Sequence, residues 1–282
     1  MRTVLVLVRA LAERPPPPEQ LPFGRAALAL EREGIGVSLG GLRAVSGGWT
    51  ADEREVVAVY DRFPSCTWPE DYRPPEGIPL ENSHAIQALC RDKLACQRVT
   101  GGPEIVIKGF QEALAGWGTG FLKPRYGAFG RGVRFVRPGD ATPATLPGTT
   151  GVPEPAILQR AVDCEFVSYR ALVQRQGRDW MCCPIVARVG EAPVVNVERG
   201  ARAEWAGPRP DLEALAVDTG RRLGGIELGV DLVVDRQGQP HVIEVNAKPT
   251  GRLEKLGHRF AEAHLQACIR PIRFLWERYS PS

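Results

Sequence analysis

Residues Gly229–Gly251, with the sequence GVDLVVDRQGQPHVIEVNAKPTG, predict two antiparallel strands joined by a tight turn. The pair Gln237-Gly238 suits a two-residue hairpin loop, because glycine readily takes the positive φ that such loops need. Pairing about that loop places Asp231 directly opposite Glu244. Residues opposite each other in an antiparallel pair share one face of the sheet.

Side-chain alternation along the second strand predicts that Val242, Glu244 and Asn246 lie on one face, together with Asp231. Two carboxylates and an amide oxygen then converge. Carboxylates this close oppose each other unless a cation lies between them, and oxygen ligands of this kind suit Mg²⁺. The alternative is a solvated hairpin face on which the charges never meet, and the hairpin by itself leaves both readings open.

Composition describes an ordinary globular protein. Of its 282 residues, 43% are hydrophobic and 24% charged, which is enough for a large core and two or three subdomains. We expect a cytoplasmic protein. A net charge of +3 is too small to indicate nucleic acid, and no apolar run approaches the ~20 residues of a membrane span. Seven cysteines without a CxxC motif predict reduced, mostly buried thiols and no zinc site.

Short apolar runs alternate with helical patterns along the chain. Strands are expected at Thr3–Val8, Ile35–Leu39, Glu55–Tyr60, Ile105–Lys108, Gly120–Lys123, Val133–Val136, Ala156–Gln159, Phe166–Gln174 and Trp180–Val189. Helices are expected at Phe23–Arg32, His84–Cys96 (capped by Ser83), Gln111–Trp117, Leu212–Leu223 and Gly257–Arg273. Irregular segments are expected at Pro15–Pro18, Arg137–Pro153 and Asn196–Gly207.

A glycine-rich loop, Pro124–Gly132, follows directly on the strand that ends at Lys123. Its glycines leave backbone N–H groups free to approach an anion, although their spacing matches neither a P-loop nor a Rossmann fingerprint. A glycine turn that merely connects two strands is the alternative. Lys123 favours phosphate binding, whereas Lys93 by itself would be an ordinary charge on a helix surface.

Taken together, FLKPRYGAFGRGV (121–133), ILQRAVDCEFVSYRALV (157–173) and the hairpin resemble the ATP-grasp superfamily over about residues 83–252. The nearest branches are the spore-coat-associated, ribosomal-S6-modification and glutathione-synthetase types. The resemblance implies an α/β (α+β) protein, in which a small α/β domain (1–85) precedes two α/β subdomains (86–157 and 158–282) that clamp ATP.

The resemblance also implies a set of site residues. Adenine would contact the hinge, which consists of Gln159, Arg160 and Ala161. The ribose would meet an acidic residue, either Glu165 or its rival Asp163. Two lysines and the glycine loop would hold the phosphates: Lys93, Lys123, Gly127, Gly130 and Gly132. Arg170 and Arg188 match arginines that meet phosphate or a substrate carboxylate. Asp231, Glu244 and Asn246 match the Mg²⁺ ligands, although many members carry Glu at the first of these positions and Lys248 is unusual.

Such enzymes join a carboxylate to an amine, or less often a thiol, through an acyl phosphate, and they release ADP and phosphate. The expected partners are therefore ATP, Mg²⁺ and a small or peptide acid and amine, with no nucleic acid or membrane; assembly into a homo-oligomer is left open. Two alternatives are a phosphotransferase on the same fold and a non-catalytic nucleotide-binding protein of envelope assembly. The acid and the amine have no readable signature in the sequence.

Overall fold

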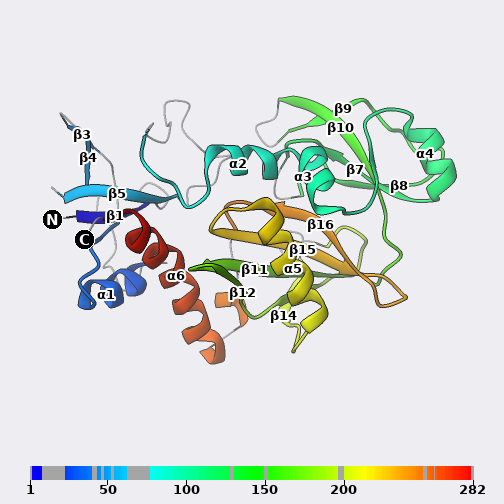
Figure 1. Cartoon of the computed structure of the whole chain (residues 1–282). Coiled ribbons are helices and arrows are strands. Elements are labelled where there is room, and N and C mark those ends of the chain that lie inside the picture. The colour runs from blue at the N-terminus through cyan, green and yellow to red at the C-terminus, as the bar shows by residue number, and fades with distance from the viewer. Residues whose placement is uncertain are drawn as a thin grey trace.

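Three β-sheets follow one another along the chain (Figure 1). The computed structural model describes residues 2–7, 23–39, 43–45, 48–51, 54–61, 77–127, 130–148, 152–195, 200–249, 253–256 and 258–280. The irregular segment expected at Pro15–Pro18 lies outside these residues. An α+β architecture built on sheets flanked by helices agrees with the expected fold class.

The N-terminal sheet has the strand order β2-β1-β5-β4-β3. Its strands are β1 (Arg2–Leu7), β2 (Val37–Leu39), β3 (Arg43–Val45), β4 (Gly48–Ala51) and β5 (Arg54–Asp61). Strand β1 runs parallel to both β2 and β5, which confirms the reading of its apolar run as a buried parallel strand. The hairpin of β3 and β4 was not predicted.

Two helices cover one face of this sheet. They are α1 (Gly24–Arg32) and the C-terminal helix α6 (Ala261–Tyr279). Val4, Val6, Leu30 and Ile272 belong to the same buried cluster. Helix α6 also contacts the third sheet, so the end of the chain packs between its beginning and the part that carries the hairpin (Figure 1).

The second sheet has the order β6-β10-β7-β8, and β9 pairs with β10. These strands are β6 (Ile105–Val106), β7 (Gly120–Pro124), β8 (Arg134–Val136), β9 (Thr145–Pro147) and β10 (Pro153–Arg160). Helix α4 (Phe110–Trp117) shares a buried cluster with the sheet through Leu114, Leu122 and Leu158. The segment Arg137–Pro153, expected to be a mere connector, therefore contributes a short strand.

The third sheet has the order β14-β13-β11-β15-β16, with β12 on β11. Its strands are β11 (Val167–Gln176), β12 (Asp179–Cys182), β13 (Val186–Val189), β14 (Arg202–Trp205), β15 (Glu227–Val234) and β16 (Pro240–Asn246). Helix α5 (Pro210–Leu223) packs on one face, where Ala171, Val230 and Leu232 are buried. On the other face, the 3-10 turns η3 (Leu253–Leu256) and η4 (His258–Phe260) and helix α6 lie near Leu172 and Val186. That cover leaves the part of this face around Arg170 and Arg188 open to a cavity.

Four other expected elements differ from the structure. The single helix His84–Cys96 is two helices, α2 (His84–Arg91) and α3 (Lys93–Thr100), because the Asp92 side chain accepts hydrogen bonds from Leu94 N and Ala95 N and starts a new helix. The single strand Trp180–Val189 is interrupted at residues 183–185, and the polar loop Asn196–Gly207 contains β14. The C-terminal helix continues beyond Arg273 to Tyr279, despite Pro271 inside it.

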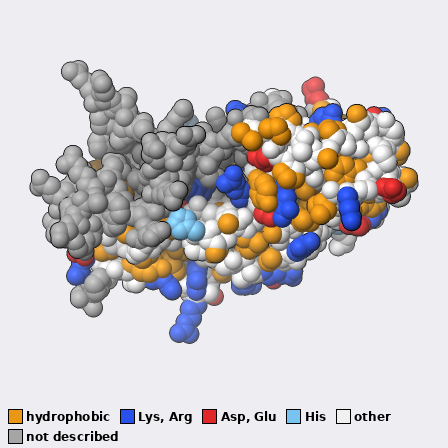
Figure 2. Space-filling view, turned by 90° about the horizontal axis from the view of Figure 1, so that it is seen from above, with side chains coloured by type: hydrophobic (Ala, Val, Ile, Leu, Met, Phe, Trp, Pro, Cys, Tyr) orange, Lys and Arg blue, Asp and Glu red, His pale blue; other side chains and the backbone are white. Residues whose placement is uncertain are grey.

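The surface agrees with the modest net charge. On the face seen in Figure 2, the Lys and Arg side chains of the described residues lie singly or in small groups among apolar and polar ones. No helix in the described part of the chain is long and apolar enough to cross a bilayer. The cysteines at positions 90, 96, 183 and 268 are buried, as expected of structural thiols.

Candidate functional site

A cavity of about 1550 Å³ lies between the second and third sheets. Strands β7 and β10 line it from one side and β11, β13, β15 and β16 from the other, while α2 and α3 contribute at one end. Of the residues expected at the site, those that line this cavity are Lys93, Lys123, Gly127, Gly130, Gln159, Arg160, Ala161, Asp163, Glu165, Arg170, Arg188, Asp231, Glu244 and Asn246. Gly132 is not among its lining residues.

The hairpin β15–β16 brings the two expected carboxylates face to face. Asp231 pairs with Glu244 in the ladder, as predicted. The turn, however, closes through Asp235 N and Gln239 O and so contains three residues rather than two. A bulge at Ile243 then shifts the register back by one residue.

The bulge also corrects the predicted set of residues on the face of Glu244. Val242 pairs with Leu232 and is buried with it in the core against α5, so it does not share the face of Glu244 and Asn246. Ile243 lines the cavity in its place. Alternation fails here because a bulge adds one residue to a single strand and reverses the side-chain pattern beyond it.

Two arginines hold the Asp231 carboxylate in the cavity. The side chain of Arg170 holds this carboxylate in a fork, with Nε 2.5 Å from Oδ1 and Nη2 2.6 Å from Oδ2. Arg188 donates a further hydrogen bond from Nη2 to Oδ1. Burial alone would raise the pKa of Asp231, but the charges and hydrogen bonds of the two arginines outweigh it and hold the pKa below its usual range.

Close packing explains the glycine before this aspartate. A Cβ on Gly229 would lie 2.6 Å from Cβ of Pro249 and 3.4 Å from Cδ of Arg170. Only glycine lets the chain at Pro249 cross β15 here while the Arg170 side chain extends towards Asp231. The signature GVD at the start of the hairpin is therefore a packing requirement of the site.

Lys123 is a buried cation on the opposite wall. Its Nζ donates to Oε1 of Gln159 at 2.6 Å. Burial lowers the pKa of Lys123 to about 8; Glu244 and Asp231 act in the opposite direction, and Lys93 adds to the lowering. A buried ammonium with one neutral partner is well suited to receive an anion, because an anion would compensate its lost hydration.

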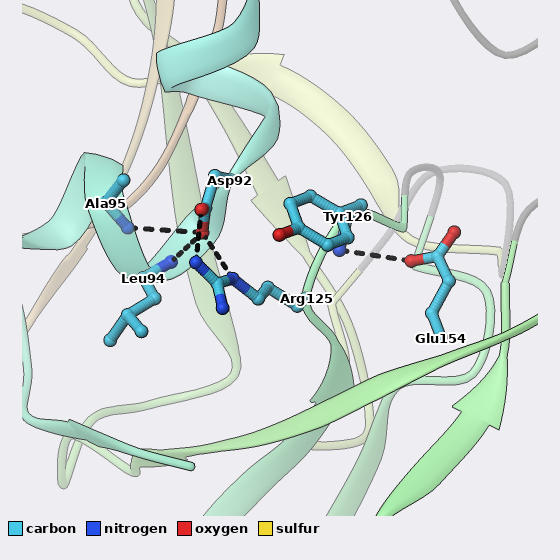
Figure 3. A network of polar contacts seen from close by, with 6 residues as sticks. All are labelled: Asp92, Leu94, Ala95, Arg125, Tyr126 and Glu154. Atoms are coloured by element: carbon cyan, nitrogen blue, oxygen red, sulfur yellow. Dashed lines mark hydrogen bonds and ion pairs between the residues drawn. The ribbon is translucent and has the colours of Figure 1, made fainter.

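The start of the glycine loop is fixed by polar contacts from three elements. Arg125 donates two hydrogen bonds to the Asp92 carboxylate, from Nε to Oδ1 at 2.8 Å and from Nη2 to Oδ2 at 2.5 Å (Figure 3). Tyr126 N donates to the Glu154 carboxylate at 3.1 Å. Lys93 Nζ donates to the carbonyl oxygen of Gly127. The first residue of α3 and the loop therefore lie together, which brings Lys93 from a helix surface into the cavity.

Two of the loop glycines are required by packing against Pro124. A Cβ on Gly127 or on Gly132 would lie 2.9 Å from a side-chain atom of that proline. Gly132 also has a φ of +70°, which L-residues rarely adopt. We expected Gly127, Gly130 and Gly132 all to contact an anion. The packing and φ of Gly132 indicate that this glycine shapes the loop. Residues 128 and 129 lie outside the described part of the chain.

The hinge after β10 has its backbone donors already engaged. Arg160 N donates to Glu104 O at 2.9 Å and Ala161 N to Thr119 O at 3.2 Å. The two acidic candidates next to it differ: Asp163 pairs with Arg236 of the β15–β16 turn at 3.0 Å, while Glu165 is exposed at the cavity. Both carboxylates are exposed, but that of Asp163 already has a cationic partner.

The donor set on β15 and β16 fits Mg²⁺ in type. Asp231, Glu244 and Asn246 supply two carboxylates and an amide to one cavity. Both oxygens of Asp231 accept hydrogen bonds from arginines, so a cation would compete with Arg170 and Arg188 for them. Within the described residues no group of three or more His, Cys, Asp or Glu side chains could hold a metal. A metal here therefore depends on the amide of Asn246 or on phosphate oxygens.

Comparison with known proteins identifies the class. Residues 110–252, just over half of the chain, match the family model described as the ATP-grasp domain. The chain therefore belongs to the ATP-grasp family, whose members use ATP. No curated protein matches the sequence significantly.

Solved ATP-grasp enzymes share the fold over nearly the whole chain. The ATP-grasp ligase PsnB, solved with a minimal precursor, has a TM-score of 0.62 at 15% identity, covering 95% of this chain and 98% of its own. The D-cycloserine synthetase DcsG has a TM-score of 0.63 at 20% identity, covering 98% of this chain and 99% of its own. D-alanyl-alanine synthetase A from Vibrio cholerae has a TM-score of 0.57 at 15% identity, covering 96% of this chain and 99% of its own. Identities this low establish the fold alone.

Three residues of the site were not anticipated. Asp92 and Arg125 form their fork across segments 33 residues apart, and Ser168 lies beside Arg188 on the neighbouring strand. The motif Asp92-Lys93, with a helix-capping residue before a lysine, was a local signal that could have placed the start of α3. Ser168 has no local signal, because an isolated serine in a strand is usually a surface residue.

Proposed function

We propose that this protein is an ATP-dependent ligase that joins a carboxylate to an amine through an acyl phosphate and releases ADP and phosphate. The observation that carries the proposal is the charge of the cavity. Two lysines, two arginines and two carboxylates from both sheets and from α3 line it: Lys93, Lys123, Arg170, Arg188, Asp231 and Glu244. Such a concentration of cations suits a triphosphate and a second anion.

The two lysines would hold the phosphates. Lys93 reaches the carbonyl of Gly127, and Lys123 is buried on the next wall, so a phosphate chain along the loop could meet both ammonium groups. Backbone N–H groups of Gly127 and Gly130 would add donors. Gln159, Arg160 and Ala161 would contact adenine, and Glu165 the ribose.

The two arginines would hold the reacting anions in place. Arg170 is fixed by its fork to Asp231, and Arg188 shares that carboxylate, so neither guanidinium needs to be ordered when a substrate arrives. Positioning of this kind, with charge neutralisation, is the main contribution that proteins make to phosphoryl transfer. The transferred phosphoryl group would form a bond to the substrate carboxylate as its bond to ADP breaks. The amine would then displace phosphate.

Asp231, Glu244 and Asn246 are the residues that would hold Mg²⁺. When bound, such a metal would offset the negative charge of the phosphates. The substrate class remains broad: the similar structures include PsnB with a precursor peptide and a synthetase of the small molecule D-cycloserine. We propose a small-molecule or peptide acid and an amine acceptor.

The test is a product analysis. The purified chain is incubated with ATP and Mg²⁺ and with pools of acids and amines, and nucleotides and new masses are quantified. We expect ADP together with a condensed product that needs both ATP and the protein. AMP and pyrophosphate would contradict the proposal, a stable phosphorylated product would indicate a phosphotransferase, and binding without turnover in any pool would indicate a non-catalytic nucleotide-binding protein.

A further inference from the structure

The side chain of Asn82 connects segments that are far apart in the sequence. Asn82 lies between the N-terminal sheet and α2 and is 0% exposed. Its Nδ2 donates to the carbonyl oxygens of Glu227 and Ala247, at 2.6 Å each, and its Oδ1 accepts from Ile226 N at 2.9 Å. Both N–H groups of the amide are therefore engaged, one at the start of β15 and the other just after β16.

The turn from α5 into β15 is shaped around this amide. A Cβ on Gly225 would lie 2.4 Å from Oδ1 of Asn82, and the φ of Gly225 is +94°, which L-residues rarely adopt. Removing the amide would take a hydrogen-bond donor away from the carbonyl groups of two buried residues, Glu227 and Ala247. Such a loss is costly, so the Asn82 side chain holds these segments together.

The bond to Ala247 acts on the end of β16 that lies at the cavity. Asn246 is the last residue of β16 and pairs with Gly229, and the chain leaves the ladder directly after it. Asn82 then holds Ala247 O, and Pro249 packs close to Gly229. Asn246 is thus fixed by the ladder on one side and by the Asn82 bond on the other, which limits how its amide can lie in the cavity that it lines.

The N-terminal sheet anchors this connection. Glu81 N donates to Val59 O at 3.2 Å, so the chain just before Asn82 is bound to β5 by its backbone. Tyr60 OH, also on β5, donates to Oε2 of Glu227 at 2.6 Å. The N-terminal sheet is therefore joined to the start of β15 at two points, and through Asn82 it is joined to the end of β16 as well.

The Asn82 amide does not hold the helix that follows it. Ser83 Oγ caps α2 by accepting from Ile86 N at 3.4 Å, and Gln87 Nε2 donates to the backbone oxygen of Asn82 at 2.9 Å. Neither contact uses the Asn82 side chain. Loss of the amide should therefore spare Lys93, which lies beyond α2 at the start of α3.

We infer that Asn82 is a positioning residue of the Mg²⁺ site: through its bond to Ala247 O, it keeps the end of β16, and with it the Asn246 amide, in place for a cation. Asn82 itself is not among the residues that line the cavity. The inference rests on the proposed function, since it concerns the metal that would accompany ATP in that cavity.

The test measures how much Mg²⁺ strengthens the binding of ADP. Calorimetry with the full chain gives the dissociation constant of ADP in EDTA and in saturating Mg²⁺, and we call the ratio of the two the Mg²⁺ gain. Asn82→Asp keeps the shape of the side chain but places carboxylate oxygens opposite the carbonyl groups of Glu227 and Ala247. The Mg²⁺ gain should fall about tenfold, as is typical when a residue that supports a metal ligand is lost. The affinity for ADP in EDTA should stay close to that of the wild type.

Gln174→Glu is the matched control. Gln174 is also 0% exposed, and its Nε2 donates to Oε1 of Glu227 and to Ala267 O, so it bonds the same glutamate from a different side. Both changes of a buried amide to a carboxylate should lower the melting temperature, but only Asn82→Asp should lower the Mg²⁺ gain. If Asn82→Asp does not fold, Asn82→Ser, which adds no charge, is measured in its place with the same expectation.

Three results would overturn the positioning role. They are a Mg²⁺ gain in the Asn82 variant equal to that of the wild type, an equal fall in Gln174→Glu, and a loss of ADP affinity in EDTA as large as the loss in Mg²⁺. Each of these leaves the proposed ligase function standing, because the wild type still binds ADP with Mg²⁺. A wild-type protein that binds no ADP in either condition would instead overturn the proposed function, and this inference with it.

Discussion

Two arginine–aspartate forks of nearly the same geometry lie in different surroundings, one at the start of the glycine loop and the other in the cavity. Arg125 holds Asp92 at 2.8 and 2.5 Å, and Arg170 holds Asp231 at 2.5 and 2.6 Å. The side chains of the first pair are 29% and 16% exposed, and those of the second are 12% and 8% exposed. The first fork joins a loop to a helix, whereas the second lies deep between strands and recruits another arginine.

The difference shows that hydrogen-bond geometry alone does not set the energetic weight of an ion pair. Near water, breaking the pair lets both charges be hydrated again, so little stability is lost. In the buried pair, removing one partner leaves the other charge without compensation. The predictions that follow from this contrast run from the largest expected effect to the smallest.

Replacing the buried aspartate should have the largest effect. Asp231→Asn would leave the guanidiniums of Arg170 and Arg188 without their carboxylate, and the free energy of unfolding should fall by about 3 to 5 kcal/mol. Urea denaturation without nucleotide measures this. The matched control is Asp211→Asn, since Asp211 is held by Arg209 in a fork at 3.0 and 2.6 Å on the surface. That change should cost less than about 1 kcal/mol, and equal losses in the two variants would refute the contrast.

Glu244→Gln should separate chemistry from stability. The change keeps the shape of the side chain but removes a charge that Mg²⁺ would need, so ATP turnover should fall by roughly a hundredfold or more. The melting temperature without nucleotide should change little. Relief of repulsion with Asp231 is offset by the loss of attraction to the buried cations, which are Lys123, Arg170 and Arg188. Turnover close to that of the wild type would remove Glu244 from the site.

Nucleotide affinity should depend on pH through Lys123. Its pKa is lowered to about 8, mainly by burial, so the ammonium loses its proton just above neutrality. If phosphate binds the protonated form, affinity for ADP with Mg²⁺ should fall up to about tenfold between about pH 7 and pH 9. Lys123→Gln should bind more weakly at pH 7 and show a flat profile. Calorimetry across this range decides, and an unchanged slope in the variant would rule out this role of Lys123.

The same lysine should affect stability in the opposite sense. Its folded pKa lies below the unfolded value of 10.5, so the unfolded chain binds more protons between these two values. The contribution of Lys123 to the free energy of unfolding should therefore rise as pH increases from about 8 to about 10.5. Lys123→Gln should lack this rise in urea titrations.

The sequence predicted the parts of this molecule that depend on local patterns. The opposition of Asp231 and Glu244 followed from alternation and one glycine turn. That prediction was right although the turn has an extra residue, because the bulge at Ile243 restores the register. Gly238, with its φ of +83°, fits both turn lengths, so the sequence could not distinguish them. Val242 was predicted on the wrong face of the strand, because simple alternation does not account for the bulge at Ile243.

The residues that the sequence missed depend on contacts between distant segments. Asp92 breaks a continuous helical pattern by capping α3, and its fork to Arg125 depends on where the glycine loop lies. Ser168 gains its place only when β13 pairs with β11 and sets Arg188 opposite it. No periodicity within one segment records such pairings.

The smallest effect is expected at the more exposed fork. In a double-mutant cycle of Asp92→Asn and Arg125→Gln, the coupling energy should be about 0.3 to 1 kcal/mol, close to that of the surface pair Arg209–Asp211. Asn is used because it keeps an oxygen to cap α3. The hydrogen bond from Arg125 comes first among the causes that lower the pKa of Asp92. The coupling should therefore be present above the unfolded pKa of an aspartate and be lost as pH falls through the lower folded value.

Although the Asp92–Arg125 fork contributes little to the free energy of unfolding, its loss should weaken nucleotide binding. Lys93 N donates to Arg125 O at 3.2 Å, and Lys93 Nζ reaches Gly127 O, so the fork helps to hold the lysine against the loop. Either single change should weaken binding of ADP with Mg²⁺ a few-fold, by calorimetry, while the double variant should be little worse than the singles. Changes at Arg209 and Asp211 should leave that affinity unaltered. A coupling in stability as large as the loss in Asp231→Asn would mean that geometry, rather than burial, sets the strength of these pairs.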